Sequence, residues 1–196
     1  MIIVDIETTG VNPYLHGIAS IGAVDFLKPD RQFYGECRIR DGVRINADSL
    51  NINDFTEDQL YDPTKISEKE LLENFFAWTD DAENRTMSGH NPGFDLYFLL
   101  QACSANSVNF PLAQRTIDLH SVCLMHMMQN KIQIPVQKKR SALNSDTVMK
   151  YVGLPTEPKP HNALNGALWE AEAFSRLLYG KKLFDRFFHY PLFNEI

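Results

Sequence analysis

Several features that mark other classes of protein are scarce in this chain. Its 196 residues include only three cysteines, Cys37, Cys103 and Cys123, and their spacing is neither close nor paired. No disulfide framework or cysteine-rich zinc site follows from them, and we expect three reduced thiols in a cytoplasmic protein. The opening Met-Ile-Ile-Val-Asp is too short and lacks the basic leader of a signal peptide. No apolar run approaches the roughly 20 residues that cross a membrane.

Positive charge is also in short supply. The chain has 19 lysines and arginines against 25 aspartates and glutamates, which gives a net charge of −6. Proteins that grip long duplex nucleic acid gain affinity by neutralising many phosphates, so this balance argues against such a grip. A protein that holds a few nucleotides at a strand end needs few phosphate contacts. A carboxylate cluster in it would be acidic and offset by bound metal.

The chain also lacks repeats and low-complexity tracts, and its apolar patterns predict one α/β domain spanning residues 1–196. Five strands are predicted, at residues 2–4, 18–27, 32–39, 85–89 and 116–118. Five helices are predicted, at residues 67–79, 94–105, 119–130, 141–152 and 162–179. Residues 28–31 are expected to turn a hairpin, and residues 131–140 and 155–160 to form loops. Three β segments followed by alternating helices and strands indicate a mixed β-sheet flanked by α-helices.

Two carboxylates end the first predicted strand. Asp5 and Glu7 are two residues apart, so their side chains project from one face of the strand. Like charges held that close repel unless a cation joins them, and hard oxygen ligands suit Mg²⁺ or Mn²⁺. The hydroxyls and flexible backbone of residues 8–10 are suited to hold a sugar or phosphate. The simpler interpretation is a strand end with two solvated acids, which this short pattern alone would favour.

Two further clusters begin with histidine. His90-Asn91-Pro92-Gly93-Phe94-Asp95 places an acid near a helix start, where it either complements the helix dipole or serves as a third ligand for metal. His161 lies just before the last predicted helix, and an imidazole there suits proton abstraction from water at neutral pH. Each histidine taken alone is more often an ordinary loop or surface residue.

Taken together, the order and spacing of these motifs resemble the DEDDh, or DnaQ-like, family of 3′–5′ exonucleases. The D-x-E motif with T-x-G matches residues 5–10, and H-N-x-x-F-D matches His90, Asn91, Phe94 and Asp95. The third motif, H-x-A-x-x-D, matches at His161 and Ala163. The resemblance covers nearly the whole chain and implies a ribonuclease H-like fold, two divalent cations (Mg²⁺ or Mn²⁺), and hydrolysis at nucleic-acid 3′ ends that releases nucleoside 5′-monophosphates.

The resemblance also implies roles for residues. Asp5, Glu7 and Asp95 would hold the two ions, and His161 would take the proton from the attacking water. Contacts with the terminal nucleotide would come from Thr8, Thr9, Gly10, His90, Asn91 and Phe94. The expected partners are single-stranded DNA or RNA 3′ ends or short oligonucleotides, with no membrane.

The chain departs from the family pattern at its fourth acid, because Gly166 stands five residues after His161. Glu170 lies one helical turn further on, and helix side chains lean toward the N-terminus. Glu170 would therefore point into a gap that Gly166 leaves open and serve as a metal ligand. Three alternatives stay open. Glu170 is an ordinary exposed glutamate, the chain is a catalytically silent nucleic-acid-binding module, or Gly166 is an engineered change.

Two further features stay open from sequence. The aromatic-rich tail of residues 183–193 fits either a homodimer surface or a stacking platform for a strand, although such residues more often pack in a core. Lys138-Lys139-Arg140 forms a small basic cluster that either touches phosphates of the strand or belongs to a solvated loop.

Overall fold

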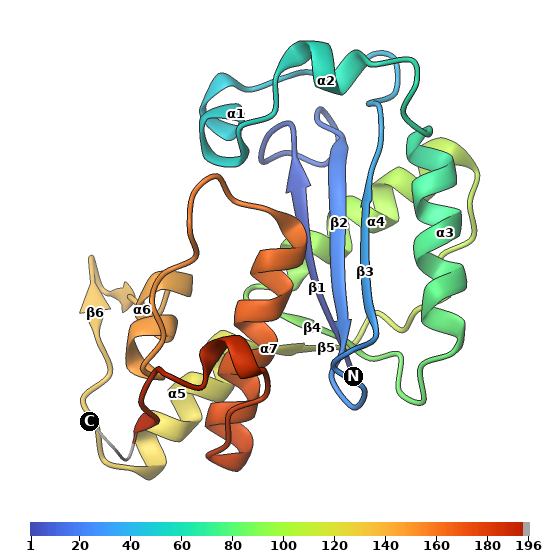
Figure 1. Ribbon diagram of the computed structural model, residues 1–196. Helices are drawn as coiled ribbons and strands as arrows, with labels where there is room; N and C mark the ends of the chain where they lie inside the picture. Colours follow the sequence, from blue (N-terminus) through green and yellow to red (C-terminus); the bar gives the residue numbers. More distant parts are fainter. Residues whose placement is uncertain (194–196) are drawn as a thin grey trace.

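A five-stranded mixed sheet forms the centre of the computed structural model, which describes residues 1–193 (Figure 1). Its strands are β1 (Ile2–Thr8), β2 (Ile18–Asp25), β3 (Gln32–Glu36), β4 (Met87–Gly89) and β5 (Thr116–Asp118). They lie in the order β3-β2-β1-β4-β5. The first three strands pair antiparallel, and β4 pairs parallel with both β1 and β5. The predicted mixed sheet flanked by helices is confirmed.

Strand β1 is longer than predicted, and this places both acids inside it. Asp5 pairs with Gly22 and Glu7 with Ser20, so the ladder with β2 continues to Thr8. The strand was expected to end at Asp5 because polar residues begin there. The strand continues past the apolar run because backbone groups of β2 form hydrogen bonds with those of β1 there.

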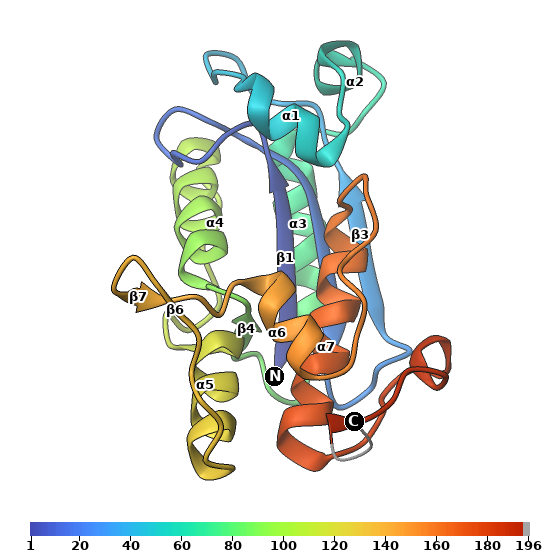
Figure 2. The same ribbon diagram turned by 90° about the vertical axis from the view of Figure 1, so that its left-hand side faces the viewer.

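Helices cover both faces of the sheet (Figure 2). One face packs against α3 (Glu68–Asp80) and α4 (Gly93–Asn106), and the other against α5 (Leu119–Gln129), α6 (Ser145–Tyr151) and α7 (Ala163–Tyr179). Ile2, Val4 and Ile6 belong to the first core, and Ile3 to the second. Because strand side chains alternate, Asp5 and Glu7 share the Ile3 face, which is the face of α7.

Helix α7 lies unusually close to the sheet at its first turns. A Cβ atom at Gly22 of β2 would overlap the backbone of Ala163, so the glycine permits direct contact between helix and strand. The side chain of Asn162 caps the helix by accepting hydrogen bonds from the backbone N–H groups of Leu164 and Asn165. Gly180 ends it with a left-handed φ of 61°. This close approach positions the residues around Gly166 against β1.

The segment between β5 and α7 differs most from the prediction. Residues 131–140 were expected to be a loop, but β6 (Val136–Gln137) and β7 (Arg140–Ser141) form a short antiparallel hairpin. Its turn consists of two lysines, which are not turn-forming residues and so give no sequence signal. Helix α6 begins at Ser145 rather than at residue 141, because Asn144 caps it by accepting from the N–H of Thr147.

Two short helices across one end of the sheet, α1 (Ala47–Asn53) and α2 (Glu57–Tyr61), were not predicted (Figure 1). Each is too short to display a helical period. By contrast, the helix predicted from residue 67 begins with a capping box, in which Ser67 and Glu70 exchange hydrogen bonds. Reciprocal caps of this kind are readable from sequence because all of their partners are local.

The aromatic tail packs mainly into the core, with a 3₁₀ turn at Asp185–Phe187. Phe187 is 1% exposed, whereas Phe188 is 54% exposed. Glu172 and Arg176 form a buried ion pair within α7 at 2.7 Å. Arg176 donates hydrogen bonds to backbone oxygens of this tail, and Glu172 accepts hydrogen bonds from its backbone N–H groups. The three cysteines are free and buried. Within residues 1–193, no helix is both long and apolar enough to cross a membrane.

Candidate active site

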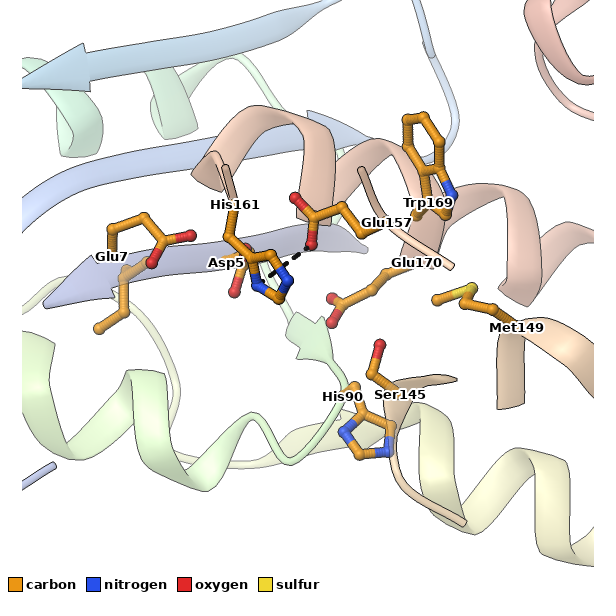
Figure 3. A pocket seen from close by; sticks show the side chains of 11 residues that line it. Asp5, Glu7, His90, Ser145, Met149, Glu157, His161, Trp169 and Glu170 are labelled. Carbon is orange, nitrogen blue, oxygen red and sulfur yellow. Dashed lines mark ion pairs between the residues drawn. The ribbon is translucent and has the colours of Figure 1, made fainter. Parts of the chain in front are cut away.

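A cavity of about 240 Å³ lies between β1, α6 and α7, beside the loop that precedes α7 (Figure 3). It is lined by Asp5, Ile6, Glu7, His90, Ser145, Met149, Glu157, His161, Gly166, Trp169 and Glu170. Six of the residues singled out in the sequence therefore meet here, from three separate parts of the chain. Four of the lining side chains are carboxylates.

The two acids of β1 are held in an environment that favours their protonated forms. Burial raises the pKa of Glu7 to about 7, and the negative charge of Glu157 adds to the effect. Burial also raises the pKa of Asp5 well above its ordinary value, and Glu170 is the strongest of the neighbouring charges that act in the same direction. Such crowding of acids is costly without a cation to neutralise them.

Asp95 lies in the first turn of α4 and is 5% exposed. Burial raises its pKa to about 7, partly offset by hydrogen bonds from its own backbone N–H and from that of Ile6. It does not line the cavity itself, but its charge acts on Asp5, Glu7 and Glu170. The helix start predicted from sequence therefore brings this acid within electrostatic reach of the other carboxylates.

Glu170 is a buried residue of α7, not an exposed helix glutamate. It is 7% exposed, and Figure 3 shows its carboxylate pointing into the cavity. Burial raises its pKa well above the ordinary value, and the charge of Asp95 raises it further. Its Oε2 atom is buried without a hydrogen-bond partner. A buried carboxylate oxygen left unpaired is costly and marks a place where a cation or proton is needed.

The space at Gly166 is not an open gap, contrary to the expectation from sequence. A Cβ atom at this position would overlap Oδ2 of Asp5 and lie 2.8 Å from its Cγ. The carboxylate of Asp5 thus occupies the volume that a side chain at position 166 would need. The glycine allows α7 to approach β1 closely, and sequence alone does not show this because the contact joins residues 161 positions apart.

His161 lies beside an acid that was not predicted, and the two form an ion pair only when the imidazole is protonated. Its Nδ1 atom lies 3.8 Å from Oε2 of Glu157, drawn as a dashed line in Figure 3. Glu157 also accepts a hydrogen bond from the backbone N–H of Asn162 at 3.2 Å. Burial raises the pKa of Glu157, while His161 acts against that shift. The available signal was the position of an acid four residues before His161 in a proline-rich loop.

The second motif is held by contacts outside it. His90 lines the cavity, and its Nε2 atom lies 3.0 Å from the backbone oxygen of Leu143. Asn91 has a left-handed φ of 56°, and its N–H donates to Asp118, which also caps α5. Asp118 therefore fixes the loop that carries His90.

The remaining predicted residues lie outside the cavity wall. Thr9 is fully buried, and its hydroxyl bonds the backbone at Arg44 and Gly17. Thr8 donates to the backbone oxygen of Gly10. Phe94 is half-buried and packs on Phe98, with ring centroids 4.9 Å apart. These side chains shape the loops at the rim of the site.

The donor set fits a hard divalent cation. Asp5, Glu7, Asp95 and Glu170 supply only carboxylate oxygens, which suit Mg²⁺ or Mn²⁺, and the unpaired Oε2 of Glu170 lacks a partner that a cation would provide. In the part of the chain that the structure describes, no three acidic, histidine or cysteine groups are yet close enough together to hold an ion. Side-chain rotation of these acids toward one another would be needed for binding.

Comparison with known proteins decides the family. Residues 2–174 match the sequence profile of the exonuclease family RNase_T. The chain belongs to this exonuclease family. Among curated proteins, none matches it in sequence.

Solved structures place this exonuclease-family chain in the ribonuclease H-like fold. It is similar to the cell-death related nuclease 4 (CRN-4), with a TM-score of 0.72 and 16% identity over 92% of this chain and 64% of that one. The nuclease domain of 3′hExo, described as a DEDDh family member bound to rAMP, gives a TM-score of 0.70 and 16% identity over 93% and 96% of the two chains. E. coli exonuclease I in complex with an oligonucleotide gives a TM-score of 0.71 and 15% identity over 92% of this chain and 40% of that one. The chain thus spans less than two thirds of CRN-4 and of exonuclease I.

Proposed function

We propose that this chain is a metal-dependent 3′–5′ exonuclease in which Glu170 replaces the acid missing at Gly166. The observation that carries the proposal is the buried carboxylate of Glu170, which has an Oε2 atom without a hydrogen-bond partner and faces the same cavity as Asp5, Glu7 and His161. If Glu170 did not replace the missing family acid, its burial beside two other acids would be costly and without a function. Membership of the exonuclease family supports the reaction class.

Asp5, Glu7, Asp95 and Glu170 would hold two divalent cations, Mg²⁺ or Mn²⁺. When bound, these ions supply positive charge that neutralises the phosphodiester and activates water. The side chain of His161, which lines the cavity and is 35% exposed, accepts the proton from the attacking water. Glu157 orients the imidazole from its Nδ1 side. The shortened strand leaves with a 3′ oxygen, and a nucleoside 5′-monophosphate is released.

The substrate would be a single-stranded 3′ end of DNA or RNA, or a short oligonucleotide. One structural neighbour was solved with oligonucleotides, and another is described as a 3′-exonuclease with 3′-end specific recognition of a histone mRNA stem-loop, which supports a nucleic-acid ligand for this fold. His90, Asn91 and Phe94 lie on the β4–α4 side of the site and would contact the terminal nucleotide. The Thr8–Gly10 segment would do so through its backbone, with the buried Thr9 hydroxyl holding the loop.

A Glu170→Gln variant tests the assignment. The change keeps the size of the side chain and removes its charge, so we expect Mn²⁺-dependent release of mononucleotides from a labelled oligonucleotide to be abolished. The melting temperature should not fall, because the variant removes a buried carboxylate whose Oε2 atom has no hydrogen-bond partner. Glu73→Gln, on the exposed face of α3, is the matched control and should retain full activity.

Other outcomes separate the alternatives. Full activity of Glu170→Gln would refute the assignment. If Glu157→Gln abolishes activity and Glu170→Gln does not, the missing acid's role belongs to Glu157. If the unaltered chain releases no mononucleotide while binding the oligonucleotide, the chain is a silent binding module, as the loss of the acid at Gly166 would then imply.

A further inference from the structure

The β6–β7 hairpin carries an unusual turn. Val136 pairs with Ser141 and Gln137 with Arg140, so Lys138 and Lys139 form a two-residue connection. Both lysines have left-handed φ angles, 49° and 61°. Two-residue hairpin turns with positive φ at both positions strongly favour Asn-Gly, because other side chains are strained there. The chain places two cations where a different sequence would be more stable.

The charges on this hairpin are unsatisfied within the described part of the chain. Residues 136–141 are all exposed. No ion pair among residues 1–193 includes Lys138, Lys139 or Arg140. Three adjacent unpaired cations stand out on a chain with a net charge of −6. Backbone strain combined with free positive charge indicates that the tip meets a ligand rather than stabilises the fold.

The base of the hairpin is anchored to the candidate active site. Ser141 Oγ lies 2.8 Å from Nε2 of His120, and the backbone oxygen of Leu143 lies 3.0 Å from Nε2 of His90, which lines the cavity. The N–H of Ala142 closes the base by donating to Pro135. Ser145, shortly after the hairpin, also lines the cavity. The hairpin therefore has a defined position relative to the carboxylates, and Figure 2 shows it projecting beside α6.

From this geometry we propose that residues 136–141 form a basic arm that binds the phosphate backbone of the substrate strand upstream of its 3′ end. The proposal rests on the proposed function and extends it to the strand outside the cavity. At about 3.3 Å per residue, the tip stands about 13 Å from Leu143. That distance corresponds to roughly four phosphates of a stacked strand at 3.4 Å each. The acidic cavity repels a polyanion, and the arm supplies a local attraction for it.

The test replaces the strained lysines by the residues that the turn prefers. Lys138→Asn combined with Lys139→Gly removes two charges and relieves the turn, so the melting temperature should stay equal or rise. Binding of a 5′-labelled oligothymidylate of about 12 nucleotides is measured by fluorescence anisotropy in Ca²⁺ over a series of KCl concentrations. We expect weaker binding and a slope of log K against log[salt] that is smaller by about 1.4, since each phosphate contact with a single strand contributes about 0.7.

Two control variants accompany it. Lys138→Arg with Lys139→Arg keeps the charge and should keep the slope. Lys69→Gln with Lys181→Gln removes the same charge from exposed positions on α3 and after α7, and should also keep it. The proposal of a basic arm would be refuted if the Asn-Gly variant kept the wild-type slope, or if the distant pair of substitutions lowered the slope equally. It would also be refuted if the unaltered chain bound no oligonucleotide.

The proposal of a basic arm and the proposed exonuclease function can be refuted separately. Mononucleotide release is assayed on the unaltered chain with Mn²⁺. Its absence would defeat the proposed exonuclease activity, while the anisotropy slopes would still decide whether the arm binds a strand.

Discussion

At the scale of single residues, Gly166 and Asp5 are the most informative pair. The glycine has no ligand atom, yet the position is not free, because the carboxylate of Asp5 fills the space where a Cβ would project. A residue that is usually interpreted as a loss therefore has a steric role in this chain. It lets α7 lie against β1, and we propose that the acidic function falls to Glu170, one turn further along the helix.

Replacing Gly166 with alanine tests this steric role. Alanine favours a helix by about 1 kcal/mol over glycine, but overpacking a tight contact costs about 1–3 kcal/mol. We expect the free energy of unfolding to fall by up to about 2 kcal/mol and oligonucleotide hydrolysis to fall with it, because Asp5 must move. Urea unfolding and the Mn²⁺-dependent assay provide the two measurements.

Gly93→Ala is the matched control. Gly93 opens α4, and a Cβ atom there would meet nothing within 4 Å, so neither stability nor activity should drop. If Gly166→Ala is as stable and as active as the unaltered chain, then Asp5 turns aside freely and the close approach does not need a glycine.

At the scale of elements, the start of α7 combines a structural cap with the candidate site. Asn162 accepts from the backbone N–H groups of Leu164 and Asn165, while its own N–H donates to Glu157. Its neighbour His161 donates its backbone N–H to Ile52 of α1. The orientation of the imidazole thus depends on how this helix begins and on a short helix that the sequence did not predict.

We expect Asn162→Ala to cost about 1 kcal/mol of stability, the usual effect of removing an N-cap, and to lower kcat as well. Ser67→Ala, which removes the cap of α3 on the opposite face of the sheet, should cost about the same stability and leave kcat unchanged. Thermal unfolding and steady-state kinetics of the two variants provide the comparison. An equal loss of kcat in both would mean that Asn162 acts only through global stability.

At the scale of the whole molecule, the distribution of charge is uneven. Carboxylates converge on the cavity in a chain of net charge −6, whereas the free cations of the β6–β7 hairpin stand at the edge of the same region. Burial raises the pKa values of Glu7 and Asp95 to about 7 from ordinary values of 4.5 and 3.8. The folded protein therefore retains protons that the unfolded chain has already released.

The raised pKa of Glu7 makes the stability of the folded protein fall as the pH rises. The contribution of Glu7 to stability is fully present below its unfolded pKa of 4.5 and is lost as the pH rises through about 7. Without divalent ions, the melting temperature of the unaltered chain should thus fall relative to that of Glu7→Gln across this window. Mn²⁺ should raise the melting temperature more above pH 7 than near pH 4.5, because ion and proton compete for the same oxygens.

Differential scanning calorimetry of both proteins, with and without Mn²⁺, provides the measurement. Subtracting the variant removes the contributions of titrating groups that do not interact with Glu7. Parallel curves for the two proteins would contradict the raised pKa of Glu7, and stabilisation by Mn²⁺ that does not depend on pH would place the ion away from these acids.

Much of this protein was determined by sequence alone. Local and periodic patterns are sufficient for the five strands of the central sheet, the capping box at Ser67 and the three motifs, because strand alternation and helix caps involve residues near each other in the chain. The family resemblance follows from those motifs and agrees with the match over residues 2–174. The Lys-Lys turn, which contains no turn-forming residue, was not predicted, and neither were the short helices α1 and α2.

Only the tertiary structure decided the contents of the site. The burial of Glu170, the pairing of Glu157 with His161 and the occupation of the Gly166 space by Asp5 all join segments distant in sequence. Sequence spacing suggested that Glu170 would fill an empty position, and the packing of α7 on β1 leaves no such position. The physical reason is that burial and close approach depend on how helices pack against the sheet, and no local pattern specifies that distance.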